Sequence, residues 1–143
     1  MHRDLKPQNV LWKSKDKSFL ENQIVICDFG ISCREKLGKG SNKESDCLNT
    51  SAGTLGYMAP EILVQFDNGV PAAEFVLGCQ SDIYSLGIVF YELLTLTSPW
   101  RENGKDDLAS QNIKSKIDFS NGNRDLKGVA GEARKLLEWM LQP

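Results

Sequence analysis

Residues 83–96 are the most apolar stretch of the chain, and this stretch most limits the possible folds. Its only charged side chain is Glu92, and its apolar residues would cover nearly the whole circumference of a helix. The stretch is shorter than the ~20 residues that a helix needs to cross a bilayer. Ser81 is a suitable N-cap, and Asp82 is well placed in the first turn. We therefore expect a helix from Ser81 to about Leu96, buried on all sides in a mostly helical body.

The composition is that of one ordinary globular domain. The chain has 143 residues, of which 41% are hydrophobic and 25% are charged, and a domain of this length buries roughly two thirds of its unfolded surface. A net charge of −2 argues against binding to nucleic-acid phosphates, and no membrane contact is expected. Four scattered cysteines and a single histidine predict neither a zinc site nor a disulfide framework. We therefore expect a reducing compartment, with a cytoplasmic location.

Shorter patterns predict the remaining elements. Residues 10–12 and 23–27 are β-prone and are expected to pair as a hairpin with a long connection. Residues 38–51 are polar and rich in Gly, Ser, Asn and Lys, as is typical of a loop. Short helices are expected at residues 60–63 and 108–117. The clearest helix begins near Gly131 and runs to the chain end without a terminating signal, because the apolar side chains of residues 133–141 recur at i, i+3, i+4, i+7 and i+8. The sequence thus predicts a helical lobe edged by a small β-hairpin.

Five short motifs follow one another along the chain. They are His2-Arg3-Asp4-Leu5-Lys6-Pro7-Gln8-Asn9, Asp28-Phe29-Gly30, Gly53-Thr54, Tyr57-Met58-Ala59-Pro60-Glu61 and Asp82-Ile83-Tyr84-Ser85-Leu86-Gly87. Together and in this order, they closely resemble the signature set of the protein kinases. The resemblance implies a protein-kinase-like fold, α+β overall, of which residues 1–143 are a partial domain. This part is the mainly α-helical C-terminal lobe with a small β-hairpin.

The resemblance also implies roles for four polar residues. Asp4 matches the catalytic aspartate that accepts the proton of the substrate hydroxyl, and Lys6 resembles the lysine that stabilises the γ-phosphate of ATP. Asn9 and Asp28 match the two ligands of Mg²⁺, a cation that prefers oxygen donors. A plainer alternative is that Asp4 and Asp28 are solvated loop carboxylates.

Four further residues resemble structural parts of the kinase site. Leu11 corresponds to the apolar residue that packs under the adenine of ATP, although it is also an ordinary strand residue. His2 and Phe29 resemble members of the buried spine between the two lobes, so His2 is expected to be packed rather than a catalytic base. Asp82 resembles the helix carboxylate that braces the catalytic loop through backbone amides. Its alternative is plain compensation of the helix dipole.

The residues around Lys6 and the pair Gly53-Thr54 resemble serine/threonine kinases, so the expected partner is a protein substrate with a Ser or Thr acceptor. Thr54 would lie near Asp4 and Lys6. Arg3 resembles the arginine that binds a phosphorylated activation loop, and Thr50 is the leading candidate for that phosphosite, modified by an upstream kinase or by autophosphorylation. Alternatively, the loop merely contains hydroxyl groups.

The chain also departs from the family pattern. The N-terminal lobe and its nucleotide-binding residues are missing, and the chain stops before the arginine that normally pairs with Glu61. Residues 62–81 form a longer segment than is usual and include a predicted turn at residues 68–71. Because helices that normally cover residues 81–96 are also missing, we expect an exposed apolar surface.

Two functional hypotheses follow. In the first, the complete protein is a serine/threonine protein kinase that depends on ATP and Mg²⁺, while the isolated chain is inactive because positioning supplies most of this catalysis. In the second, the chain is a non-catalytic scaffold or decoy that binds kinase partners. The kinase subgroup stays open among tyrosine-kinase-like, sterile-kinase and endoplasmic-reticulum stress-sensor types.

Overall fold

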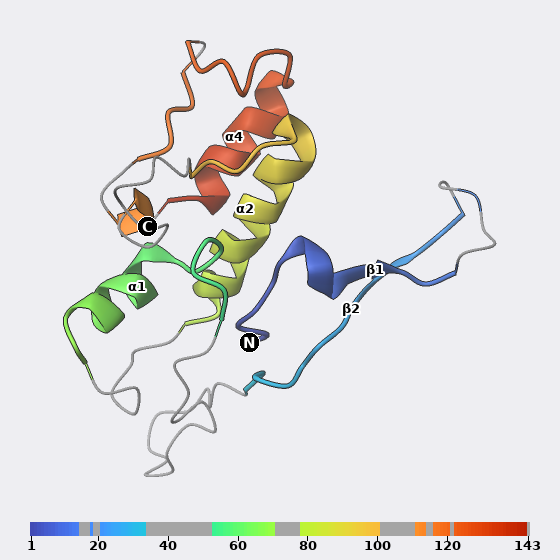
Figure 1. The fold of residues 1–143 in the computed structure, drawn as a ribbon. Helices are drawn as coiled ribbons and strands as arrows, with labels where there is room; N and C mark the ends of the chain where they lie inside the picture. Colours follow the sequence, from blue (N-terminus) through green and yellow to red (C-terminus); the bar gives the residue numbers. More distant parts are fainter. Residues whose placement is uncertain are drawn as a thin grey trace, which may run out of the picture.

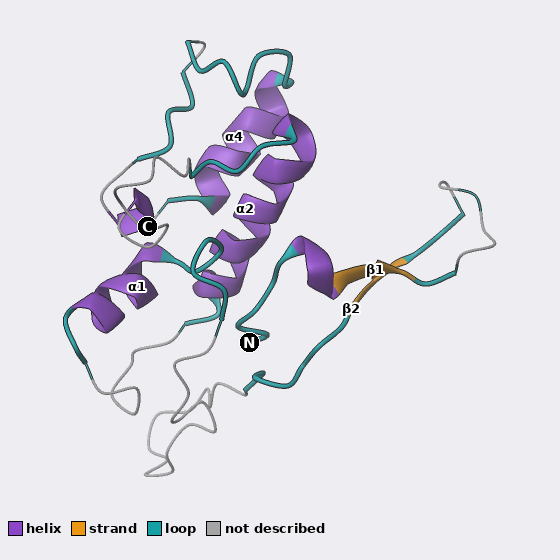
Figure 2. Cartoon of the chain, viewed as in Figure 1, coloured by secondary structure: helices purple, strands orange, loops and turns teal. Residues whose placement is uncertain are grey.

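The computed structural model describes residues 1–14, 18, 21–33, 53–70, 78–100, 111–113, 116–120 and 122–142. Figures 1 and 2 show a group of helices from which a two-stranded ribbon projects. The elements, in chain order, are η1 (Pro7–Asn9), β1 (Val10–Trp12), β2 (Ile24–Ile26), α1 (Pro60–Asp67), α2 (Gln80–Thr95) and α4 (Gly131–Met140). This arrangement confirms the predicted helical lobe with a small β-hairpin.

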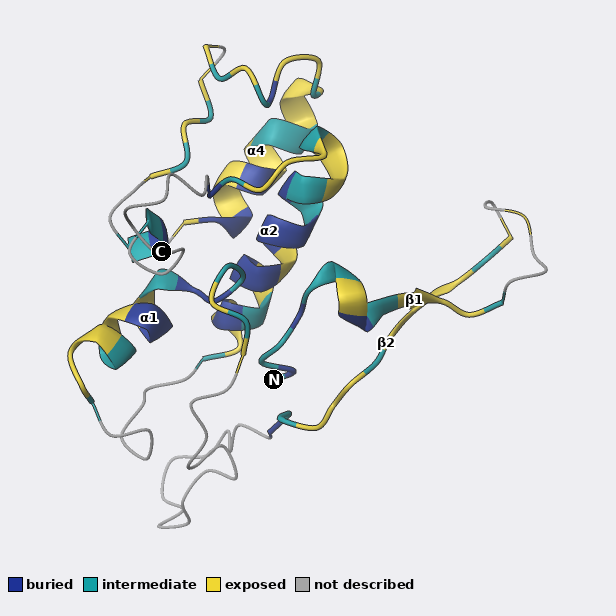
Figure 3. Cartoon of the chain, viewed as in Figure 1, coloured by how far each residue is buried: buried dark blue, intermediate teal, exposed yellow. Residues whose placement is uncertain are grey.

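The hairpin pairs β1 with β2 in antiparallel register. Val10 lies opposite Ile26, and Trp12 lies opposite Ile24. The ribbon points away from the helices (Figure 1), so most of its apolar side chains are exposed, as the yellow segments of Figure 3 show. Its base is tied to the chain that precedes it, because the Cys27 amide donates to the Asn9 carbonyl at 3.0 Å.

Helix α2 forms the centre of the helical part. It begins at Gln80 with Cys79 as the N-cap, so the prediction that Ser81 caps the helix is wrong. The Ser81 hydroxyl instead donates to the Gly78 carbonyl at 2.9 Å, and the start of α2 has no side-chain capping hydrogen bond. The helix ends at Thr95, and its C-cap residue Leu96 adopts a left-handed conformation with φ 57°.

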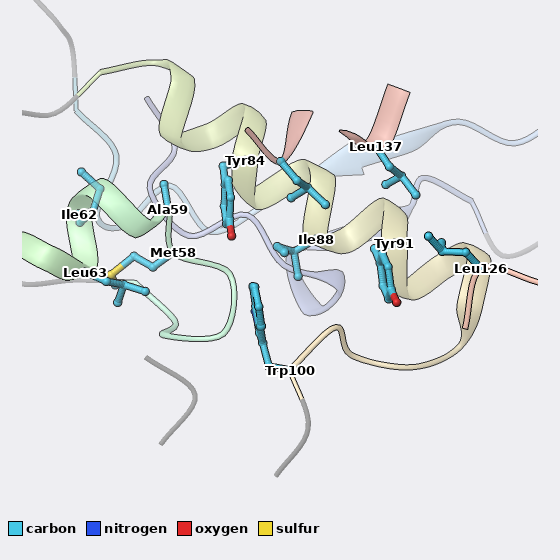
Figure 4. Close-up of a cluster of buried hydrophobic side chains, with 11 residues drawn as sticks. Met58, Ala59, Ile62, Leu63, Tyr84, Ile88, Tyr91, Trp100, Leu126 and Leu137 are labelled. Atoms are coloured by element: carbon cyan, nitrogen blue, oxygen red, sulfur yellow. The ribbon is translucent and has the colours of Figure 1, made fainter. Parts of the chain in front are cut away.

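One side of α2 lines the hydrophobic core. Tyr84, Ile88 and Tyr91 are each at most 5% exposed and recur along α2 at helical spacing (Figure 4). They pack with Met58 and Ala59 from the segment before α1, with Ile62 and Leu63 of α1, with Trp100, and with Leu126, Leu137 and Leu141 near the C-terminal end. The core therefore joins α1, α2 and α4 across most of the described chain.

The other side of α2 is not buried, which corrects the prediction of burial on all sides. Leu86 and Leu93 are 40% and 66% exposed, and Leu136 of α4 is 46% exposed. With Val89, Phe90 and Met140, they line an open groove of about 250 Å³ between the two helices, which we call the α2–α4 apolar face. The prediction of an exposed apolar surface is confirmed for the described residues.

Helices α2 and α4 approach each other closely at Gly87. A Cβ atom built on Gly87 would lie 2.8 Å from Cδ2 of Leu141 and 3.1 Å from Cβ of Met140. Only glycine leaves room for this contact without a shift. Helix α4 begins at Gly131, as predicted, but ends at Met140 instead of continuing to the chain end.

The other helix predictions have mixed outcomes. Helix α1 starts at Pro60, as predicted, but continues to Asp67. Gly69 then takes φ +66°, which forms part of the turn predicted at residues 68–71. Of the helix predicted at residues 108–117, residues 111–113 are helical, while residues 116 and 117 are not, so the prediction is wrong there. Residues 108–110, 114 and 115 lie outside the described residues.

The cysteines differ from the prediction. Cys33 is disulfide-bonded, so the expectation of a chain without disulfides is wrong, while Cys27 and Cys79 are free thiols. Within the described ranges, no helix is both long and apolar enough to span a bilayer. No cluster of three or more His, Cys, Asp or Glu side chains in the same ranges could hold a metal ion.

Candidate active site

The segment before η1 is held in place by α2. The Asp82 carboxylate accepts hydrogen bonds from the His2 amide at 2.7 Å and from the Arg3 amide at 2.8 Å. Arg3 has φ 74°, a left-handed conformation that costs a non-glycine residue about 1–2 kcal/mol. Two charge-assisted hydrogen bonds therefore hold a strained backbone, which simple dipole compensation would not do.

The His2 side chain is a structural link. Its Nδ1 atom accepts from the Asp4 amide at 3.3 Å, so Nε2 carries the proton and donates to the Cys27 carbonyl at 2.9 Å. The ring meets Phe29 edge-on, with centroids 4.9 Å apart. His2 is buried, but Phe29 is 61% exposed, so the expectation of a buried Phe29 is wrong.

Asp4, Lys6 and Thr54 form one hydrogen-bonded cluster. Lys6 Nζ lies 2.7 Å from Asp4 Oδ2 and donates to Thr54 Oγ1 at 3.0 Å, while the Thr54 hydroxyl donates to Asp4 Oδ1 at 2.7 Å. Partial burial alone would raise the pKa of Asp4. Hydrogen bonds from Lys6 and Thr54, together with the Lys6 charge, outweigh burial and hold that pKa below its usual range. Asp4 is therefore an ionised, fully oriented carboxylate.

Asn9 fixes the other side of Asp4. Its side chain is buried, and Nδ2 donates to the Asp4 carbonyl at 2.8 Å. Among the described residues, no donor binds its amide oxygen, which is thus available as a ligand. Asp28 follows β2 with φ 63° and an exposed side chain, whose Oδ1 lies 3.4 Å from the Gly30 amide. Asn9 directly precedes β1 and Asp28 follows β2, so the bond between Cys27 and Asn9 holds these two candidate metal ligands at the same end of the hairpin.

The remaining predicted residues are more dispersed. Leu11 lies on β1 and is 46% exposed, which leaves an apolar surface on the hairpin. Partial burial lowers the pKa of Arg3, although the Asp82 charge opposes the shift, and the Arg3 guanidinium reaches the Ile31 carbonyl at 3.4 Å. Glu61 is exposed in the first turn of α1. Thr50 lies outside the described residues.

Sequence reasoning missed the residues that hold the segment after Thr54. The Tyr57 hydroxyl donates to Glu92 of α2 at 2.8 Å, and burial and the Glu92 carboxylate both raise the Tyr57 pKa. The Tyr57 carbonyl accepts from Ser85 at 2.8 Å. Neither pair has a local sequence pattern, because each joins positions far apart in the chain. The motif Tyr57-Met58-Ala59-Pro60-Glu61 includes Tyr57 but does not indicate that Glu92 is its partner.

Sequence comparisons with known proteins identify the family of this chain. The protein kinase domain family matches residues 1–143. The chain is 32% identical over 142 residues to the calcium/calmodulin-dependent protein kinase cmkA of Emericella nidulans, covering 99% of this chain and 30% of that protein. It is 34% identical over 119 residues to the calcium/calmodulin-dependent protein kinase type 1 of Caenorhabditis elegans, covering 83% of this chain and 28% of that protein.

A third relative is the human ribosomal protein S6 kinase alpha-6, 35% identical over 145 residues, which cover 99% of this chain and 17% of that protein. The chain thus spans less than a third of the length of each of these three relatives. The matched segment includes the Asp4–Lys6–Thr54 cluster, the loop braced by Asp82 and the helices that carry them. The chain therefore belongs to the protein kinase domain family.

Proposed function

We propose that residues 1–143 are part of the catalytic domain of a serine/threonine protein kinase, in which the γ-phosphoryl group of ATP passes to a Ser or Thr hydroxyl of a protein substrate. The observation that carries this proposal is the Asp4 carboxylate, held by Lys6 and Thr54 on its two oxygens and by Asn9 behind it. Phosphoryl transfer depends mainly on positioning and charge, and this cluster provides both.

Asp4 is proposed to orient the acceptor hydroxyl. Each carboxylate oxygen has two lone pairs. Oδ2 already accepts from Lys6 at 2.7 Å and from Asn9 at 3.4 Å, whereas Oδ1 accepts from Thr54 and can accept one further hydrogen bond. Because the Asp4 pKa is lowered, the group is ionised at neutral pH and is a weak base. Its contribution is therefore to align the hydroxyl oxygen and to accept its proton late in the reaction. Lys6 would donate to a phosphate oxygen from the same side.

Asn9 and Asp28 are the candidate ligands of Mg²⁺, and their chemistry fits this cation. Both offer oxygen donors, and Mg²⁺ is usually bound through one or two side chains together with substrate phosphates. When bound, the cation neutralises charge on the phosphate oxygens. The exposed apolar side chain of Leu11 suits the face of an adenine ring.

The test is phosphorylation of a Ser/Thr peptide by the complete kinase that contains this segment. Asp4→Asn should lower kcat by several orders of magnitude while the KM for ATP stays unchanged. Asp28→Asn should instead raise the Mg²⁺ concentration needed for half-maximal rate. Asp67→Asn, an exposed carboxylate at the end of α1, is the matched control. Full activity of Asp4→Asn would refute the assignment.

The isolated chain is proposed to be inactive, and a scaffold or decoy role is the second candidate. The α2–α4 apolar face supports the second role, because an exposed apolar groove of this kind marks a contact surface. Incubation of the 143-residue chain with ATP, Mg²⁺ and peptide tests both roles. Phosphate transfer that disappears with Asp4→Asn would show that the isolated chain is a catalyst.

A further inference from the structure

Residues 53–59, which we call the docking loop, contain no helix or strand, yet their backbone is well satisfied. Three consecutive carbonyl groups each accept a hydrogen bond from a side chain of a different segment. Trp100 Nε1 donates to Gly56 at 3.0 Å, Ser85 Oγ donates to Tyr57 at 2.8 Å, and Asn112 Nδ2 donates to Met58 at 2.7 Å. Irregular backbone that is buried needs such donors. The docking loop therefore owes its shape to these three side chains.

Asn112 is the most deeply placed of the polar donors. It is 3% exposed, and its Oδ1 atom accepts from the Tyr84 hydroxyl at 2.7 Å while its Nδ2 atom serves Met58. A side-chain amide can accept from one buried partner through its oxygen and donate to another through its nitrogen, at two separate atoms. Asn112 thus links α2 to the docking loop through one planar group.

Met58 passes this placement on to the catalytic cluster. Its Cε atom lies 2.8 Å from the position of a Cβ atom built on Gly53, and the Arg3 carbonyl lies 3.0 Å from the same position. Gly53 therefore lies between the Met58 side chain and the Arg3 carbonyl. The next residue, Thr54, carries the hydroxyl that binds Asp4, and its carbonyl accepts from the Tyr57 amide at 2.9 Å. The Met58 backbone that Asn112 holds is thus connected to Thr54 through the turn that the Tyr57–Thr54 hydrogen bond closes.

We propose that Asn112 is a positioning residue for the protein substrate, acting through Met58, Gly53 and Thr54 on the alignment of the acceptor hydroxyl at Asp4. This inference rests on the proposed kinase function. It assigns to the helical turn at residues 111–113 a part in peptide phosphorylation and none in the handling of ATP.

The experiment compares two reactions of the complete kinase, peptide phosphorylation and ATP hydrolysis without peptide. Asn112→Asp keeps an acceptor for the Tyr84 hydroxyl but replaces the donor to Met58 by a carboxylate oxygen. It should lower kcat/KM for peptide about 10-fold to 100-fold, the range expected when an acceptor is misplaced by up to ~1 Å. The KM for ATP and the rate of ATP hydrolysis should stay within about twofold.

Tyr84→Phe is the matched control, because it removes the hydrogen bond to Oδ1 and leaves the bond from Nδ2 to Met58. It should keep most of the peptide activity. The ¹³C resonance of the Met58 carbonyl in the 143-residue chain should move in Asn112→Asp and stay nearly unchanged in Tyr84→Phe. If Asn112→Asp does not fold, Asn112→Ser removes the amide without adding a charge and carries the same expectations.

An equal loss of peptide phosphorylation and ATP hydrolysis in a folded variant would overturn the inference, because a merely structural residue affects both reactions. Unchanged peptide kinetics would overturn it as well. If the unaltered kinase hydrolyses ATP but phosphorylates no Ser/Thr peptide, the proposed function fails first. Wild-type peptide phosphorylation by Asn112→Asp is a different result, and it would refute only the positioning role of Asn112.

Discussion

Replacing Asp82 by alanine should destabilise the folded chain far more than loss of a helix-terminal charge would. The substitution removes both charge-assisted hydrogen bonds to the His2 and Arg3 amides, each worth about 1.5–3 kcal/mol. Relaxation of the left-handed Arg3 backbone would return about 1–2 kcal/mol. The net loss in the free energy of unfolding is then about 1–5 kcal/mol. Compensation of the helix dipole alone would be worth only about 0.3–1 kcal/mol.

Urea denaturation of the 143-residue chain, followed by tryptophan fluorescence, measures this difference. Asp82→Glu separates the two explanations, because it keeps the charge in the first turn but moves the carboxylate away from the two amides. We expect Asp82→Glu to lose most of the stability that Asp82→Ala loses, while Asp67→Ala, at an exposed site, should lose almost none. Wild-type stability in Asp82→Glu, or a loss below about 1 kcal/mol in Asp82→Ala, would refute the anchoring role.

Three further predictions concern single sites. Lys6→Met removes the largest of the interactions that lower the Asp4 pKa, so the pH midpoint of the Asp4 carboxyl ¹³C resonance should rise; an unchanged midpoint would contradict the cluster. Because the carboxylate form is favoured in the folded chain, the stability that Asp4 contributes should be lost as the pH falls through its lowered pKa. Gly87→Ala should lower the free energy of unfolding by about 1 kcal/mol, because overpacking against Leu141 costs about 1–3 kcal/mol and the higher helix propensity of alanine returns at most about 1 kcal/mol. A raised melting temperature would contradict this, because it would show that α2 and α4 move apart for the added methyl group at no net cost. Leu96→Gly should raise the melting temperature by relieving φ 57° at an 88% exposed residue, and a lower melting temperature would show that the leucine side chain matters more than the backbone.

Elements with a local pattern could be predicted well. The apolar spacing of residues 133–141 is enough to place α4, and Pro60 is enough to place the start of α1. The extent of burial could not be predicted for α2, because a helix that is apolar all round carries no information about which of its sides is covered. The exposed Leu93 is of this kind. The exposed Phe29 has another origin, because its burial was expected from resemblance to the spine between the two lobes and not from any local pattern.

The candidate site shows the same division. Motif resemblance identified Asp4, Lys6 and Thr54 as neighbours, and the structure places them within hydrogen-bond distance. The residues that fix the docking loop were not found from the sequence. The bond from Asn112 to Met58 spans 54 positions of the chain, and no propensity or periodicity reports a contact between such distant residues.

The contacts of Asp82 also bear on the order of folding. They join residues that are 79 and 80 positions apart, and closing so large a loop is entropically costly and slow. Arg3 has no local reason to adopt its left-handed conformation before the carboxylate arrives. We therefore expect the segment before η1, residues 1–6, to take its shape late, after α2 has formed and docked. The folding φ-values, which report structure in the transition state, should be near zero at His2 and Arg3. The Asp4–Lys6–Thr54 cluster would then form only as the last step of a completed fold.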